Sequence, residues 1–399
     1  MNNKVYINTL IILSIGYFID FYDLSIFSVN YSKIIPDLFG ITNETSIQLL
    51  YLKITNFYNV GIFLGCVLFG VIGDKYGRTS VIKLSIILYS VTILLSIFAH
   101  NIWEFIVLRF LSGIGLATEF STSSILISEL LNNSKRTNIN ISLLYLSGIL
   151  GGITATFIGL FSWKWMFLFG GAFGIILYFL RSNMFESQIY LNLKNKDCSK
   201  GSIINLLNNK SSLFKIIKLT LLSIPFYFMI SVMFIVPKFI NLNLNLVKSI
   251  HLLLIYFFIG NIIGTLLSGI LVKKFHNYIK IMWGTLILFC GTLLLTNFIN
   301  NNFYIIYCLS LGIIGGCFPI VWIQLVIKNF GINQRNTATN ILTALGRVST
   351  VLYNVLISYW ISINFMNFMT ITTILISLIV SLVLFSTKDN YHQEIDFIQ

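Results

Sequence analysis

Five ionisable residues stand inside long apolar stretches of this 399-residue chain: Asp20, Asp23, Arg109, Glu119 and Arg347. Insertion scales put the cost of a charge at the centre of a bilayer at roughly +2.5 to +3.5 kcal/mol, so charged side chains at this depth usually have a function. We therefore expect these five residues to bind protons or a charged ligand, or to pair with one another.

The two aspartates are spaced for proton binding. Asp20 and Asp23 are three residues apart, which places them on one face of a helix. Two carboxylates a turn apart in a low dielectric cannot both ionise cheaply, so one of them should hold a proton near physiological pH. Arg109 could approach Asp23 and stabilise its ionised form. The alternative is a static ion pair that only orients two helices.

The other two buried charges suit different chemistry. Glu119 follows Thr118 and precedes Ser121, and this polar stretch could relay a proton; the alternative is a carboxyl group neutralised by neighbouring hydroxyls. Arg347 is the only ionisable residue expected deep in the second half of the chain. A lone buried guanidinium needs an anion, unless helix dipoles or backbone carbonyls satisfy it.

The elements that must position these residues are membrane-spanning helices. The chain is 56% hydrophobic and 10% charged with a mean hydropathy of +0.87, which excludes a water-soluble fold. Apolar runs of about 20 residues recur along the whole chain. They predict an all-α membrane protein with twelve helices near 7–31, 51–73, 79–98, 102–130, 138–161, 164–181, 214–237, 249–272, 279–298, 303–328, 336–360 and 364–386.

The net charge of +13 follows from topology. With both termini in the cytoplasm, 19 of the 26 Lys and Arg residues fall on the cytoplasmic side and five fall outside, namely Lys33, Lys53, Lys164, Lys238 and Lys248. This asymmetry obeys the positive-inside rule, so no nucleic-acid partner is needed. The sequence predicts a multi-pass protein of the cell membrane with both termini cytoplasmic.

The chain contains an internal repeat with an offset of 199 residues. Several glycines match at this offset, and Arg136 matches Arg335; the glycine pairs are Gly61 with Gly260, Gly65 with Gly264, Gly70 with Gly269 and Gly113 with Gly312. The predicted domains are a first six-helix bundle over 1–181, a polar cytoplasmic linker over 182–213, a second six-helix bundle over 214–386 and a cytoplasmic tail over 387–399.

The loop after the second predicted helix carries a recognisable motif. It runs from Gly70 through Asp74 to Gly77 and Arg78 and resembles the signature loop of the major facilitator superfamily. Its glycines permit a tight turn and close helix approach, and Asp74 can cap a helix N-terminus or pair with an arginine across the seam between the halves. The alternative is a short turn with solvated charges.

Four further stretches resemble the metabolite, aromatic-acid and phosphate proton symporters of that superfamily. They are Asp20-x-x-Asp23, the run from Arg109 to Glu119 that continues to Glu129 and Arg136, Phe185-Glu186-Ser187-Gln188, and the run from Arg335 to Gly346-Arg347. The resemblance implies alternating access, uptake of a small and anionic metabolite, and an Arg347 that contacts it. It also implies a gating set: Gly70, Asp74, Gly77, Arg78, Glu129, Arg136, Glu186 and Arg335. The equivalent loop of the second half lacks the Asp and the Gly-Arg.

Four aromatic residues are candidates for substrate contacts, although packing is the competing explanation for each: Tyr145, Tyr227, Trp322 and Tyr353. The five cysteines and four histidines show no spacing for a disulfide, a metal site or a proton relay. We expect the proton to be the coupling ion, with no cofactor, and a monomer in the bilayer.

Two other functions stay open at this stage. An efflux antiporter for a drug or siderophore is one, but the helix over 138–161 lacks the Gly-Pro pair of many drug antiporters in the superfamily. A transporter-like nutrient sensor is the other, although the tail from Thr387 to Gln399 is short for a signalling appendage. No nucleophile, base or cofactor loop indicates an enzyme.

Overall fold

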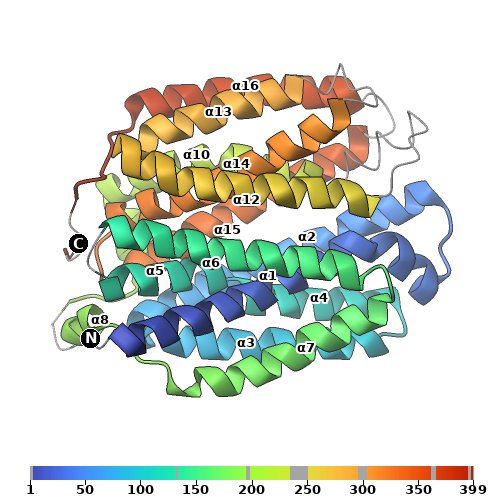
Figure 1. Cartoon of the computed structure of the whole chain (residues 1–399), viewed down its shortest axis with the longest axis horizontal. Helices are drawn as coiled ribbons and strands as arrows, with labels where there is room; N and C mark the ends of the chain where they lie inside the picture. The colour runs from blue at the N-terminus through green and yellow to red at the C-terminus, as the bar shows by residue number, and fades with distance from the viewer. Residues whose placement is uncertain are drawn as a thin grey trace.

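The computed structural model describes residues 3–131, 134–194, 198–233, 250–294, 303–360, 365–393 and 397–398, and its regular structure there is helical (Figure 1). Eleven helical spans of this part are long and apolar enough to cross a membrane, and Tyr278–Thr292 is a shorter apolar helix. Together these twelve segments confirm the predicted all-α architecture. Each predicted helix has a helical counterpart, with described ends that differ by up to eight residues; the predicted ends at 237 and 298 lie outside the described residues.

The first half contains α1 (Asn3–Phe39), α2 (Glu44–Tyr76), α3 (Arg78–Leu95), α4 (Ile102–Leu116), α5 (Glu119–Leu131), α6 (Ser134–Ile158) and α7 (Trp163–Leu180). The second half contains α10 (Lys210–Met233), α12 (Ile250–Phe275), α13 (Tyr278–Leu294), α14 (Phe303–Asn329), α15 (Arg335–Trp360) and α16 (Phe365–Ser386). Two short helices, α8 (Gln188–Lys194) and α9 (Ile203–Asn208), lie in the segment predicted as a polar linker, so that segment is partly ordered.

One predicted helix is broken in two. The sequence predicts a single helix over 102–130, whereas α4 ends at Leu116 and α5 begins at Glu119. The Cys66 thiol donates to the carbonyl oxygen of Ala117 at 3.1 Å and so satisfies an acceptor at the break. The break places Glu119 in the first turn of α5, where a carboxylate is favoured by the helix dipole.

The 199-residue repeat is visible in the packing of α2 on α4 and of α12 on α14. A Cβ added to Gly61 would lie 2.1 Å from the carbonyl oxygen of Phe110, and one added to Gly260 would lie 2.1 Å from that of Leu309. Both the glycines and the carbonyls are 199 residues apart. The same backbone contact therefore occurs in both halves, and it requires glycine because any side chain would collide with the facing helix.

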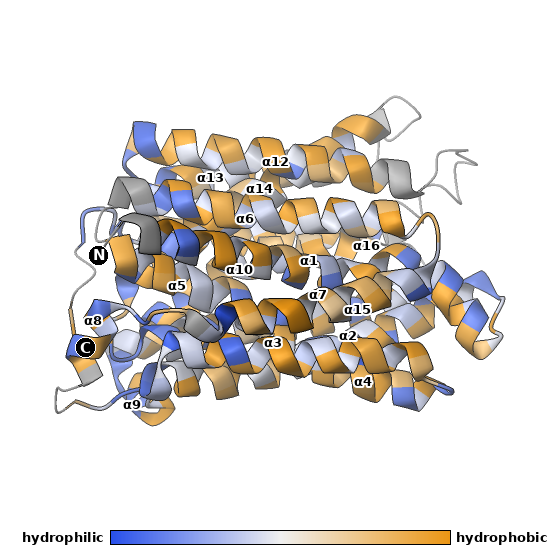
Figure 2. Ribbon diagram, turned by 60° about the horizontal axis from the view of Figure 1, so that its bottom comes forward, coloured by the Kyte–Doolittle hydropathy of each residue, from blue (hydrophilic) through white to orange (hydrophobic). Residues whose placement is uncertain are grey.

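The two halves lie side by side, with α3 and α7 at the outer edge of one and α13 and α16 at the outer edge of the other (Figure 1). Contacts between the halves are concentrated in two helix pairs, α2 with α15 and α6 with α12. Both termini and α8 lie at one end of the bundle (Figure 1), which we call the terminal end; the opposite end is the far end. Apolar residues dominate the sides of the bundle (Figure 2).

Candidate functional site

A central cavity of about 1020 Å³ lies between the halves. Residues of α1, α5 and α6 line it from one half, and residues of α10, α12, α14 and α15 line it from the other. Nine aromatic side chains form much of its wall: Tyr17, Phe21, Phe120, Tyr145, Phe226, Tyr227, Phe257, Phe318 and Trp322. A cavity that is mostly apolar with a few convergent polar groups is typical of a small-molecule site.

Three of the four predicted aromatic contacts line this cavity. They are Tyr145, Tyr227 and Trp322; the Tyr145 hydroxyl donates to the carbonyl oxygen of Gly315 at 2.8 Å across the seam between the halves. The prediction for Tyr353 is wrong in this structure. Its ring packs edge-on against Phe228 at 4.8 Å and is not among the lining residues of the cavity, because its position on α15 turns it toward α10.

Two charged residues line the central cavity, and they come from different halves. Asp20 of α1 is 6% exposed, and its Oδ1 has no hydrogen-bond partner among the described residues. Arg347 of α15 lies over the ring of Tyr227 at 5.8 Å and makes a long, 3.5 Å contact to Oδ1 of Asn59. The guanidinium therefore has a donor, Nε, without a partner among the described residues.

Asp23 and Arg109 are not arranged as the sequence predicts. Asp23 does not line the central cavity with Asp20; its carboxylate faces α7, where a Cβ on Gly170 would lie 2.2 Å from Oδ1. No ion pair joins Asp23 to Arg109 within the described part of the chain, so the expected salt bridge is absent. Three residues along a helix leave Asp23 about 60° around the axis from Asp20 and about one turn further along it. This offset is enough to give the two carboxylates different neighbours.

Glu119 is paired with an arginine that sequence reasoning missed. Both Nη atoms of Arg181 donate to the Glu119 carboxylate, and both side chains are fully buried. The sequence places Arg181 at the end of the helix predicted over 164–181 but gives it no partner. The ion pair replaces the alternative in which neighbouring hydroxyls neutralise Glu119. Arg181 ends the apolar run of α7, and a charge at the end of a long apolar helix was the available signal.

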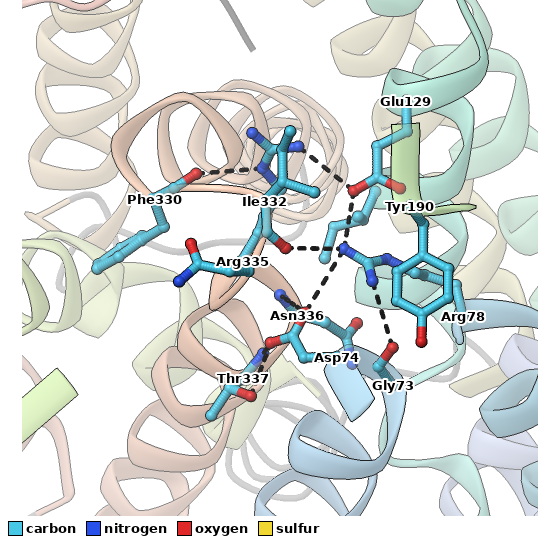
Figure 3. Close-up of polar contacts among 12 residues, drawn as sticks. Gly73, Asp74, Arg78, Glu129, Tyr190, Phe330, Ile332, Arg335, Asn336 and Thr337 are labelled. Carbon is cyan, nitrogen blue, oxygen red and sulfur yellow. Dashed lines mark hydrogen bonds and ion pairs between the residues drawn. The ribbon is translucent and has the colours of Figure 1, made fainter. Parts of the chain in front are cut away.

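The terminal end is closed by a polar cluster that we call the terminal latch: Asp74, Arg78, Glu129, Arg335, Asn336 and Thr337 (Figure 3). Asp74 accepts hydrogen bonds from the backbone N–H groups of Asn336 at 3.2 Å and Thr337 at 2.7 Å. It therefore caps the N-terminus of α15 from the other half of the molecule. This geometry agrees with one of the two contacts that the sequence predicts for Asp74.

Glu129 joins the two arginines of the latch (Figure 3). Its Oε1 accepts from Arg78 at 2.9 Å and from Arg335 at 3.3 Å, and all three side chains are buried. Arg78 also donates to the carbonyl oxygen of Ile332 at 3.0 Å, which is a further bond across the seam. Arg136 was expected to be the partner of Glu129, but its side chain lies outside the described residues.

The remaining predicted gating residues surround the latch. Glu186 accepts from the backbone N–H and the hydroxyl of Thr79 at 3.0 Å each, so it caps α3. Gly77 has φ of 107°, a conformation that favours glycine, and a Cβ on Gly70 would lie 3.0 Å from Cβ of Asn340. Tyr190 of α8 covers Arg78 at 4.6 Å, and burial raises the pKa of its phenol, which keeps it a neutral donor.

Comparison with known families decides the class of protein. The sequence model described as Major Facilitator Superfamily matches residues 13–240 and 219–396, which together span nearly the whole chain. The chain belongs to the major facilitator superfamily. It is therefore a multi-pass membrane transporter and not an enzyme.

Relatives within the superfamily are distant. The benzoate transport protein of Acinetobacter baylyi is 26% identical over 384 residues, which cover 84% of this chain and 81% of that protein. The 4-hydroxybenzoate transporter PcaK of Pseudomonas aeruginosa is 29% identical over 142 residues, 34% of this chain and 32% of PcaK. A Haemophilus influenzae protein is 29% identical over 206 residues, so the match spans about half of either chain.

Solved structures of other major facilitator transporters share the fold. The proton:xylose symporter XylE superposes with a TM-score of 0.81 at 15% identity, covering 99% of this chain and 98% of XylE. The human organic anion transporter MFSD10 superposes with a TM-score of 0.76 at 13% identity, covering 95% and 99%. At these identities the likeness concerns architecture alone.

Asn261 of α12 is a site residue that gave no signal in the sequence. It lines the central cavity, is 1% exposed and leaves its Oδ1 without a partner in the described structure. Uncharged polar residues are common in this Asn-rich chain, so neither type nor spacing distinguished it. Asn336 and Thr337 belong to the family-like run from Arg335 to Arg347, but their contacts on the α15 side of the latch were not predicted.

Proposed function

We propose that this transporter imports a small aromatic monocarboxylate together with protons, by alternating access, across the cell membrane. The observation that supports this proposal most directly is the composition of the central cavity. It combines nine aromatic side chains with one acid, Asp20, and one cation, Arg347. Aromatic walls bind a flat ring by offset or edge-to-face contacts, and a guanidinium binds a carboxylate through two parallel hydrogen bonds.

The pairing of one acid with one cation gives a route to coupling. An ionised Asp20 and a substrate carboxylate would repel each other in the same low-dielectric cavity, while Arg347 can neutralise only one of them. A proton on Asp20 removes this competition. Substrate binding is then favoured when Asp20 is protonated, and proton release favours substrate release. Asp23 is a further predicted proton-coupling residue, held apart from the cavity.

Glu119 keeps its predicted place on the proton route, although its ion pair with Arg181 gives it a second task. The pair joins the first turn of α5 to the end of α7. A proton passing through Glu119 would have to weaken this pair. Arg181 is thus a positioning residue for Glu119 in the proposed mechanism.

The terminal latch supports alternating access with the terminal end in the cytoplasm. Most of the Lys and Arg residues were assigned to this side by the positive-inside rule. The latch joins α2, α3 and α5 of one half to α15 of the other, so the central cavity is closed toward that end. Opening the latch, with Gly77 and Glu186 beside it, would release substrate inward.

The relatives are consistent with this substrate class. The protein named benzoate transport protein matches over most of this chain, and PcaK is named for 4-hydroxybenzoate. The nine-aromatic cavity gives a physical reason why a ring acid would bind here. No particular observation favours the efflux antiporter or the nutrient sensor, and the experiment below tests both.

Uptake by purified protein in proteoliposomes tests the proposal. Labelled benzoate, 4-hydroxybenzoate and nicotinate are compared with cyclohexanecarboxylate, which has a similar shape but no aromatic ring, and with neutral xylose. We expect uptake of the aromatic acids to rise several-fold with an inward proton gradient. We expect cyclohexanecarboxylate to be a poor substrate and xylose to be excluded.

Two variants assign the roles in the same assay. Asp20→Asn should abolish gradient-driven accumulation while leaving exchange of labelled for unlabelled substrate. Arg347→Gln should raise KM for benzoate at least tenfold, the effect of losing about 1.4 kcal/mol or more. Full coupling in Asp20→Asn, or unchanged KM in Arg347→Gln, would refute the respective role. Gradient-driven export would favour an antiporter, and binding without transport would favour a sensor.

A further inference from the structure

A second cavity of about 550 Å³ lies on the far-end side of the central cavity, and we call it the outer chamber. It is lined by α1, α2, α4, α10 and α15. Leu24, Ile230 and Arg347 line both cavities, so these three residues form the boundary between them. Arg347 thus presents its guanidinium to two compartments.

The outer chamber contains a buried cation that forms no ion pair within contact distance in the described structure. Arg109 of α4 lines it, is 2% exposed, and leaves Nε and Nη1 without hydrogen-bond partners among the described residues. Its guanidinium faces the rings of Phe27 at 5.3 Å, Tyr58 at 5.4 Å and Phe167 at 5.6 Å. Cation–π contacts stabilise such a charge by only about 2 kcal/mol even when desolvated, less than a counter-ion would provide.

Asp23 is the acid nearest to this arginine in the predicted scheme, but it does not neutralise it as an ion pair. The Asp23 carboxylate is directed at α7, beside Gly170, and neither of its oxygens has a partner in the described structure. The lining of the outer chamber itself contains two arginines and no acid. The lining residues therefore offer positive charge to an anion.

Uncharged donors complete the chamber. Tyr58 and Thr55 line it; the buried hydroxyl of Tyr58 has no partner among the described residues, and the hydroxyl of Thr55 lies within hydrogen-bond reach of Tyr51. Asn59 lies between them and Arg347, which it contacts through Oδ1 at 3.5 Å. A carboxylate placed here would meet a guanidinium and two hydroxyl donors, the kind of charge-assisted set that binds an oxyanion.

We propose that the outer chamber is a second carboxylate-binding subsite, formed by Arg109, Tyr58 and Thr55, which a substrate anion occupies before it reaches the central cavity. Arg347 receives the carboxylate from this subsite because it borders both cavities. This inference rests on the proposed function and adds a role for Arg109: it binds substrate rather than holding Asp23. The subsite predicts two carboxylate positions per chain.

Equilibrium dialysis of labelled benzoate against the purified full-length protein in nanodiscs counts these positions. We expect two bound equivalents in the unmodified protein and one in Arg109→Gln. In proteoliposomes, Arg109→Gln should raise KM for uptake about tenfold and change kcat less than twofold. Tyr58→Phe removes one hydroxyl and no charge, so it should raise KM about threefold even if Arg109→Gln fails to fold.

Lys53→Gln is the matched control. Lys53 is an exposed cation of α2 that faces the ring of Trp103 at 4.7 Å and does not line either cavity, so its loss should change neither stoichiometry nor KM. Arg109→Lys, which keeps the charge but not the fork of donors, should recover part of the affinity.

The outcomes separate this inference from the proposed function. One bound equivalent that Arg109→Gln and Tyr58→Phe leave unchanged, together with proton-driven uptake, would overturn the subsite alone. Two bound equivalents without proton-driven uptake would overturn the proposed function and support the subsite. No bound benzoate at all would overturn both. An equal loss in Lys53→Gln would show that the effect is one of general surface charge, and it would also overturn the subsite.

Discussion

The terminal latch and the two cavities differ in whether their buried charged groups have hydrogen-bond or ion-pair partners. In the latch, Asp74 caps a helix and Glu129 bridges two arginines, so each carboxylate meets donors of the other half. In the cavities, Asp20, Arg109 and Arg347 retain atoms without partners in the described structure. Asp20 and Arg109 are buried like the carboxylates of the latch, so burial alone does not explain the difference.

The difference indicates which charges hold the protein in one state and which are kept for a ligand. A buried ion that is paired resists separation, because each partner would be left without compensation in a low dielectric. A buried ion that is unpaired is destabilising until a proton or an anion reaches it. We therefore expect substitutions in the latch to change stability and conformation, and substitutions in the cavities to change binding.

Glu129→Gln should have the largest effect on stability. It would leave Arg78 and Arg335 buried together without the carboxylate that separates them, and breaking such a pair costs about 3 to 5 kcal/mol. Unfolding of the purified protein in mixed micelles, followed by helical signal against SDS concentration, measures this loss. Glu104→Gln is the control, since Glu104 is an exposed carboxylate that caps α4. Equal losses in the two variants would contradict the comparison.

Arg181→Gln should lower the free energy of unfolding by about 3 kcal/mol, because it leaves the buried Glu119 carboxylate without its partner. A second substitution should restore part of this loss. Glu119→Gln combined with Arg181→Gln removes both charges, so the double variant should be more stable than either single variant. The coupling energy from this double-mutant cycle checks the pairing. A purely additive result would mean that the two side chains do not interact.

The architecture was predictable from the sequence because it depends on periodic and local signals. Apolar length fixed the twelve spans, and glycines at one offset fixed the repeat, which the contacts of Gly61 and Gly260 now explain. The cap that Asp74 forms is one of the two contacts that the signature loop suggested for it. Each of these features involves residue types that have few structural alternatives at their positions.

The pairing of charges was not predictable, because it depends on how helices rotate and where they break. One break, after Leu116, sets where Glu119 meets Arg181. A rotation of α1 separates Asp23 from the cavity that Asp20 lines. The spacing of two residues along one helix gives the angle between their side chains. It does not show which neighbouring helix each side chain faces.

Asp23→Asn should change stability by less than about 1 kcal/mol, since neither carboxylate oxygen has a partner to lose in the described structure. The amide keeps the size of the side chain and removes its ability to titrate. We expect the gradient-driven accumulation of substrate to fall while unfolding stays near that of the unmodified protein. A destabilisation as large as that of Glu129→Gln would show that Asp23 is in fact paired.

Asn354→Ala should have the smallest effect, and it tests the far end of the same comparison. Asn354 of α15 donates to Oδ1 of Asn56 of α2 at 2.9 Å, across the seam between the halves. Interhelical hydrogen bonds in a membrane protein average about 0.6 kcal/mol, so the ratio of closed to open molecules at the far end should fall about threefold. Distances between spin labels placed on α2 and α15 near this end measure that population.

A variant of the terminal latch gives the matching test at the other end of the molecule. Asn336→Ala removes hydrogen bonds of the terminal end, where its amide donates to the carbonyl oxygens of Phe69 and Gly70 at 3.2 and 3.0 Å. Because the ion pairs around Glu129 remain, this variant should open the terminal end less than Glu129→Gln does. If Asn354→Ala and Asn336→Ala each favour opening at their own end, the two ends compete for one equilibrium, as alternating access requires. Opening of both ends in one variant would contradict that coupling.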